Sequence, residues 1–124
     1  MRSLLIVALG GALGAAARYT FGGWVAGRTG DGFPWGTMVV NVSGAFLIGL
    51  VLALSLDRAM IGADWRLFLT TGILGGYTTF STLSFETVAL MEKGSWALAT
   101  ANMLGSAAAG VIAVVVGLAL GRAL

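Results

Sequence analysis

The sequence predicts an all-α membrane protein with four transmembrane helices, the third of them broken. Hydrophobic residues fill 58% of the 124 positions and charged residues only 10%, whereas about 25% of a soluble domain is charged. The 20 glycines suit membrane helices that pack closely. Four apolar segments are each long enough to cross a bilayer, which takes about 20 residues. Lipid is therefore the expected solvent of this chain.

The four predicted spans follow one another with short connections, so we expect residues 1–124 to form a single domain. The spans cover about residues 4–26, 35–56, 67–91 and 95–120. The first could be mistaken for a signal peptide. Its apolar run continues past Gly14, and nothing downstream resembles a soluble domain, so we interpret it as a membrane helix.

Composition also excludes several classes of function. The chain has no Cys and no His, which removes disulfides, thiol nucleophiles and the usual zinc sites. The net charge of +2 is too small to indicate a nucleic-acid partner. Only Ser, Thr and Glu86 could act in catalysis, and no base is paired with a nucleophile, so we do not expect an enzyme.

Basic residues are distributed between the two sides of the predicted bundle with a weak bias. Because Lys and Arg set the orientation of membrane helices, a weak bias permits dual topology, in which copies insert in both directions. One side holds Arg2, Arg58, Arg66 and Arg122, and the other holds Arg28 and Lys93.

Glycines recur at a spacing of four, which places each pair on one helix face and allows close backbone contact. We expect these pairs to pack against a second copy of the chain; the alternative is that glycine is simply common in membrane helices. The pairs are Gly10 and Gly14, Gly23 and Gly27, Gly72 and Gly76, and Gly117 and Gly121.

The third span carries most of the polar chemistry. Six of the thirteen residues from Gly75 to Thr87 are Ser or Thr, and one is Glu. We expect Gly75 and Gly76 to break the helix, which is tolerated at membrane depth only where the chain lines a cavity or is buried in protein. The alternative is an unbroken helix whose hydroxyls bond to their own backbone.

Four further residues within the spans could contribute to an ion pathway. Glu86 is either a functional intramembrane carboxylate or an interfacial residue. The Asn41 amide could donate to an anion or only bridge two helices. Arg18 could attract anions, pair with Glu86 or anchor its helix. The Phe80 ring is ordinary filler or offers its electropositive edge to an anion.

Three motifs resemble those of the Fluc/CrcB family of fluoride channels. Gly10–Tyr19 looks like the first-helix signature of that family, and Pro34–Thr37 followed by Val40–Gly44 looks like the second. Gly75–Thr82 looks like the core of the third helix and is the most specific of the three. The resemblance covers essentially the whole chain, and the fourth span contributes least.

This resemblance implies an antiparallel, dual-topology dimer with two pores. It implies passive export of fluoride across the plasma (inner) membrane of a microbe, which relieves fluoride toxicity. It also implies a structural Na⁺ at the dimer centre, held by the backbone carbonyls of Gly75 and Thr78.

The family's pathway residues are carried over by motif. Asn41 matches the pore asparagine, and Phe80 matches the first of two pore phenylalanines. Arg18 matches an arginine near the aqueous vestibule. The resemblance places further polar residues beside the pore: Ser81, Thr82, Glu86, Ser106 and, less directly, Asn102.

One departure from the family pattern concerns position 83, where the second phenylalanine is replaced by Leu83. Phe85 is a poor substitute, because it lies about 200° from Leu83 around a regular helix. Either a single phenylalanine suffices, or a homologous second subunit supplies the missing ring in a heterodimer.

Two other membrane functions compete with this interpretation. A small cation exporter of the multidrug-resistance type needs a carboxylate in its first helix, and the segment from Leu4 to Ala26 has none. A subunit that only assembles with other proteins would not need a span rich in Ser and Thr.

Overall fold

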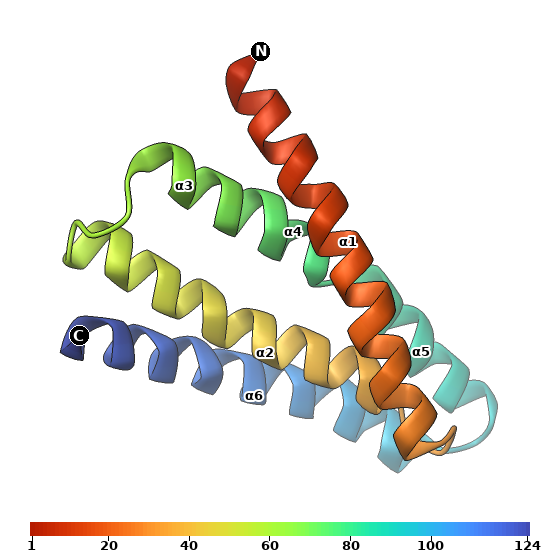
Figure 1. Ribbon diagram of the computed structural model, residues 1–124. Helices are drawn as coiled ribbons and strands as arrows, with labels where there is room; N and C mark the ends of the chain where they lie inside the picture. The colour runs from red at the N-terminus through yellow and green to blue at the C-terminus, as the bar shows by residue number, and fades with distance from the viewer.

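The computed structural model describes all 124 residues, and every regular element in it is helical, as the sequence predicts. Two π-helical segments extend the α-helices: Ala53–Asp57 continues α2, and Phe68–Leu74 joins α3 to α4. The α-helices, labelled in Figure 1, are α1 (Arg2–Thr29), α2 (Trp35–Leu52), α3 (Ala63–Leu67), α4 (Gly75–Tyr77), α5 (Phe80–Glu92) and α6 (Trp96–Ala123).

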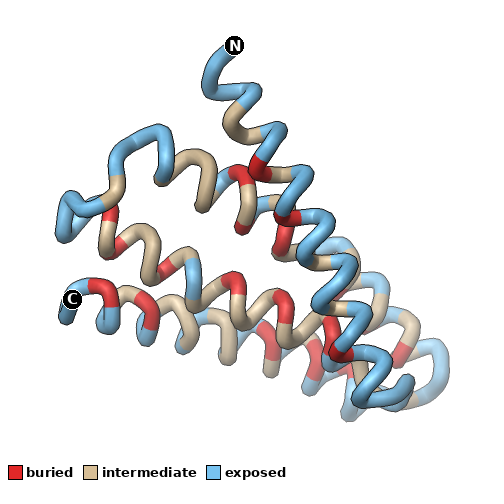
Figure 2. Tube along the Cα trace, in the orientation of Figure 1, coloured by how far each residue is buried: buried red, intermediate tan, exposed pale blue.

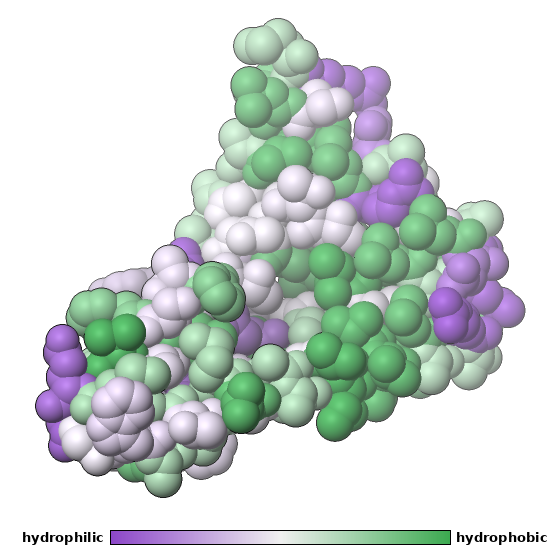
Figure 3. All heavy atoms as spheres, turned by 180° about the vertical axis from the view of Figure 1, so that it is seen from behind, coloured by the Kyte–Doolittle hydropathy of each residue, from purple (hydrophilic) through white to green (hydrophobic).

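Three continuous helices are long and apolar enough to cross a membrane: Arg2–Thr29, Trp35–Asp57 and Trp96–Ala123. α2 and α6 lie side by side, and α1 crosses the third predicted span (Figure 1). That span is helical from Ala63 to Glu92 except at Thr78 and Thr79. Hydrophobic side chains dominate the middle of the face in Figure 3, and hydrophilic groups gather mainly towards its ends.

The third span is interrupted, but not at the two glycines where the sequence predicts the break. Gly75 keeps helical angles (φ −64°, ψ −38°). The extended residues are Thr78 (φ −84°, ψ 155°) and Thr79 (φ −150°, ψ 116°). The predicted position was therefore wrong by three residues. Gly76 stays helical and instead allows the backbone of α1 to approach.

Glycines bring α1 into backbone contact with the third span. A Cβ on Gly76 would lie 2.5 Å from the carbonyl oxygen of Gly11. A Cβ on Gly10 would lie 2.7 Å from the carbonyl oxygen of Phe68. Beside this crossing, Val40 packs with Leu74 and Tyr77 in the buried core. Figure 2 shows buried residues as short stretches where the helices face each other.

Glycines also set the contact between α2 and α6. A Cβ on Gly117 would collide with the carbonyl of Phe46, and one on Gly121 would lie 2.5 Å from Ala53 Cβ. A Cβ on Gly23 or Gly27 meets nothing within 4 Å. Three of the four predicted glycine pairs therefore pack helices of the same chain, and their assignment to dimer contacts was wrong.

The charged side of the bundle joins segments that are distant in sequence. Arg2 pairs with Asp64 at 2.5 Å, which ties the start of α1 to α3. Arg122 pairs with Asp57 at 2.7 Å, which ties the end of α6 to the end of the second span. Both pairs are largely exposed, so each contributes little to stability.

We predict that Gly14→Ala destabilises the fold by about 1–3 kcal/mol, the usual range for an overpacked contact. The added Cβ would collide with the Ile73 carbonyl and lie 2.9 Å from the Tyr77 nitrogen. Gly23→Ala on the same helix is the matched control and should be neutral or slightly stabilising. Thermal unfolding of the purified protein in detergent measures both. Equal melting temperatures for the two variants would contradict the packing of α1.

Candidate functional site

Asn41 forms hydrogen bonds with both backbone groups of Thr79 at the break in the third span. From α2, its Nδ2 donates to the carbonyl oxygen of Thr79 at 3.0 Å. Its Oδ1 accepts from the backbone nitrogen of Thr79 at 2.8 Å. The side-chain amide thus supplies one donor and one acceptor to a residue that has left the helix. The bridging role considered for Asn41 is present, and one amide hydrogen remains for another acceptor.

The break also redirects hydrogen bonds that a continuous helix would use. In such a helix, the nitrogens of Thr79 and Thr82 would donate to the carbonyls of Gly75 and Thr78, respectively. Thr79 donates to Asn41 instead, and Thr82 donates to the Thr79 hydroxyl at 3.3 Å. Thr79 therefore caps α5, and the carbonyls of Gly75 and Thr78 lose their helical donors.

A second contact fixes the break from its other side. The Ser43 hydroxyl donates to the carbonyl of Val40 at 3.0 Å. Because its only hydrogen is used there, the 2.9 Å contact between Ser43 and Tyr77 has the tyrosine hydroxyl as donor. Gly44 lets this ring approach, since a Cβ there would lie 3.2 Å from a ring carbon of Tyr77.

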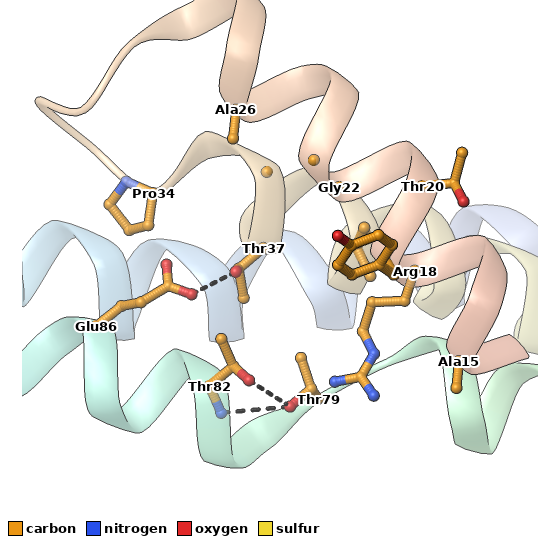
Figure 4. Close-up of a pocket in the computed structure, with 14 residues that line it drawn as sticks. Ala15, Arg18, Thr20, Gly22, Ala26, Pro34, Thr37, Thr79, Thr82 and Glu86 are labelled. Carbon is orange, nitrogen blue, oxygen red and sulfur yellow. Dashed lines mark hydrogen bonds between the residues drawn. The ribbon is translucent and has the colours of Figure 1, made fainter.

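A groove of about 890 Å³ opens on one side of the break, between α1, α2 and α5. Figure 4 shows its lining, with the Glu86 carboxylate turned towards Thr37. The Thr37 hydroxyl donates a hydrogen bond to Glu86 Oε1. The lining residues include three of the predicted pathway residues: Arg18, Thr82 and Glu86.

Arg18 lines this groove without an ion pair. The chain forms two salt bridges, and neither involves Arg18 or Glu86. The alternative in which Arg18 pairs with Glu86 is therefore not realised. The half-buried Arg18 guanidinium and the Glu86 carboxylate are therefore two separate charges of opposite sign in one groove.

A second groove, of about 540 Å³, lies on the other side of the break between α2, α5 and α6. It contains no charged residue, and Thr79 lines both grooves. Ser81 lines neither groove and is exposed. The predicted residues that do line the second groove are Asn41, Gly75, Thr78, Phe80 and Ser106.

Leu83 and the neighbouring phenylalanines lie in different surroundings. Leu83 is only 7% exposed and lines the second groove. Phe80 and Phe85 are each 74% exposed. Phe80 also lines the groove, whereas Phe85 does not. Phe85 therefore does not take the position of Leu83, in agreement with the helical angle between them.

Sequence reasoning missed three residues of this site. They are Thr79, Ser43 and Tyr77. All three lie within the motifs that resemble the fluoride-channel family, but the sequence alone predicted no role for them. Their hydrogen bonds join α2 to the break across more than thirty positions of sequence. No local signal identifies such partners.

The break is the one part of the chain that offers oxygen ligands suited to a hard cation. The chain has no cluster of three His, Cys, Asp or Glu side chains that could hold a metal. The carbonyls of Gly75 and Thr78, which lack their helical donors, are oxygen ligands of the kind that alkali cations accept. Both residues line the second groove.

Comparisons with known proteins agree with one another. The family model described as "CrcB-like protein, Camphor Resistance (CrcB)" matches residues 5–118. A protein of Thermus thermophilus named "Fluoride-specific ion channel FluC" is 52% identical over 97% of this chain and 94% of its own length. Proteins of the same name from Chloroflexus aurantiacus and Agrobacterium fabrum are 45% and 46% identical, each over 98% of this chain.

We predict that Tyr77→Phe lowers the free energy of unfolding by about 1 kcal/mol, the usual contribution of one hydrogen bond. The substitution removes the donor to Ser43 and leaves the buried ring in place. Tyr19→Phe is the matched control, because Tyr19 is exposed and should tolerate the loss of its hydroxyl. Unfolding in detergent under denaturant compares them, and equal stability of the two variants would refute the contact.

Proposed function

The chain belongs to the CrcB family, and on that premise we propose that it is a fluoride-specific ion channel of the cell membrane. It releases fluoride passively, down the electrochemical gradient, and so relieves fluoride toxicity. The observation that carries this proposal is the match to relatives named fluoride-specific ion channels over nearly the full length of both proteins. An ion channel catalyses no reaction, and we assign no catalytic residue.

The two grooves supply what a fluoride pathway needs. Fluoride is small and strongly hydrated, so a pathway must replace its water with hydrogen-bond donors without holding it too tightly. Arg18 attracts the ion into the first groove. The second groove offers the remaining amide hydrogen of Asn41, the Ser106 hydroxyl and the edge of Phe80, and it has no fixed charge. Ser81, Thr82 and Glu86 complete the predicted pathway along α5.

We also propose that two copies assemble antiparallel, as the resemblance implies. The interrupted backbone at Thr78 and Thr79 is only partly buried, and Gly75, Phe80 and Ser81 beside it are exposed. Such an interruption must be covered by protein at membrane depth. A second copy in the opposite orientation would cover it. The weak bias of Lys and Arg between the two sides permits both insertions.

A Na⁺ ion at the centre of this dimer is the proposed cofactor. The carbonyls of Gly75 and Thr78 from two copies would provide oxygen ligands, which replace the hydration shell of the ion. Bound there, Na⁺ would supply a fixed positive charge that compensates carbonyl dipoles facing one another.

The exporter alternative has less support. A proton-coupled cation exporter needs an acidic residue in its first helix, and α1 has no Asp or Glu. The one carboxylate within the third span, Glu86, is bonded to Thr37 and shares its groove with the cationic Arg18. A positive charge beside that carboxylate disfavours cationic substrates.

We predict fluoride efflux, with little chloride efflux, from liposomes that contain only this purified chain, measured with ion-selective electrodes. Asn41→Asp should abolish it, because a carboxylate oxygen would replace the donor to the Thr79 carbonyl and would repel fluoride. Ser84→Ala on α5 is the control and should keep wild-type rates, since the Ser84 hydroxyl bonds only to its own helix.

Two results would count against this proposal. Equal efflux of fluoride and chloride would contradict fluoride specificity. No efflux from folded, dimeric protein would exclude a self-sufficient homodimer. It would then favour the heterodimer alternative raised by Leu83, which co-reconstitution with a homologous subunit tests.

We predict further that Na⁺ raises the melting temperature of the purified dimer in detergent. The same concentration of N-methylglucamine chloride should not, because that cation is too large for carbonyl coordination. Dialysis against Na⁺-free buffer should lower the melting temperature again. Identical melting curves in both salts would argue against a structural Na⁺ site.

A further inference from the structure

Two buried polar atoms on α6 have no partner within the chain. Asn102 is 0% exposed and Ser106 is 5% exposed, and they lie one helical turn apart. Asn102 Oδ1 and Ser106 Oγ make no hydrogen bond. Buried polar atoms are nearly always bonded, so each exception requires a physical explanation.

The orientation of the Asn102 amide is fixed by its neighbour on α5. The Thr87 hydroxyl donates its only hydrogen to the carbonyl of Leu83 at 2.8 Å. Thr87 can therefore only accept from Asn102, whose Nδ2 lies 3.0 Å away. The amide cannot be turned round without losing this bond. Its Oδ1 consequently faces away from Thr87 as an unpaired acceptor.

The Ser106 hydroxyl does not make the local hydrogen bond that several other hydroxyls of this chain make. Seven Ser and Thr hydroxyls donate to the carbonyl four residues earlier, among them Thr87 and Thr100. Ser106 lines the second groove, but its hydroxyl oxygen is buried, so its hydrogen is available to a molecule held beside that oxygen.

The chemistry of the two atoms selects the ligand. A carbonyl oxygen accepts hydrogen bonds and repels anions, so fluoride cannot bind Asn102 Oδ1 directly. A water molecule can donate to Oδ1 and accept from the Ser106 hydroxyl. Side chains four apart on a helix have Cβ atoms about 5–6 Å apart. One water bridges such a span with two hydrogen bonds of about 2.8 Å.

We propose that Asn102 Oδ1 and Ser106 Oγ hold a resident water molecule between them, behind the wall of the second groove that Ser106 lines. The water uses one hydrogen for Asn102 and receives one from Ser106. Its second hydrogen is left to face the groove. If the proposed fluoride channel is correct, the ion meets this water at α6, and Asn102 acts as a positioning residue for the water.

The occupancy of the site can be tested without any transport measurement. A high-resolution crystal structure in fluoride-free buffer should show density within hydrogen-bond distance of both atoms. Fluoride and water scatter alike, so the ion must be absent. Ser106→Ala should lose the density, and Thr100→Val, on the exposed side of α6, should keep it. A wild-type site without density would overturn the proposal.

Magnetisation transfer from water to the Asn102 side-chain amide gives a second measurement in nanodiscs. Transfer from a long-lived water should be present in the wild type and lost in Ser106→Ala, which retains the amide. Transfer that persists unchanged in Ser106→Ala would contradict the bridging position.

The link to conduction is tested with Asn102→Leu, which keeps the branched outline of the side chain and removes both the Oδ1 acceptor and the Nδ2 donor to Thr87. Fluoride efflux should fall by about tenfold, the rate effect of one hydrogen bond, while the dimer remains intact. Thr87→Val, which removes only the Thr87 contact, is the control and should keep wild-type rates. Unchanged efflux would refute the positioning role even if the water is present. Absence of efflux in the wild type would instead count against the proposed channel, and the occupancy test would still decide the water site.

Discussion

The amide of Asn41 is the interaction on which the rest of the site depends. A helix that breaks at membrane depth leaves a backbone donor and acceptor that lipid cannot satisfy. Asn41 meets both needs at Thr79, with one donor and one acceptor from a single side chain. A hydrophobic residue at this position would satisfy neither backbone group. The break can therefore exist only where α2 presents this amide.

The break divides the polar residues of the chain into two environments. Arg18 and Glu86 line one groove together with several hydroxyl groups, and the other groove holds no charged residue. Thr79 lies on the boundary between them and faces both. In the proposed channel, a charged region beside an uncharged one would let the first attract an anion while the second binds it weakly, which is the compromise that conduction requires.

Close packing by glycine makes this arrangement compatible with a small chain. α1 contacts the backbone of the third span at Gly10 and Gly76, and α6 contacts α2 at Gly117. Most of the glycine faces are therefore already packed against another helix of the same chain. In the proposed dimer, the second copy would therefore meet the chain elsewhere, and the partly buried break at Thr78 and Thr79 is a polar segment left for it.

The sequence by itself determined the fold class, the three continuous spans to within a few residues, and the polar character of the third. Hydropathy and composition are local properties, so they could be evaluated without a structure. The position of the break, the absence of an Arg18–Glu86 pair and the contacts of Tyr77 were decided only by tertiary structure. Each depends on which side chain of another helix lies opposite, as Asn41 does at Thr79. Gly75 and Gly76 had the flexibility to break the helix, but both stay helical, and Gly76 contacts the backbone of α1 at Gly11. The break lies instead at Thr78 and Thr79, where Asn41 supplies the hydrogen-bond partner.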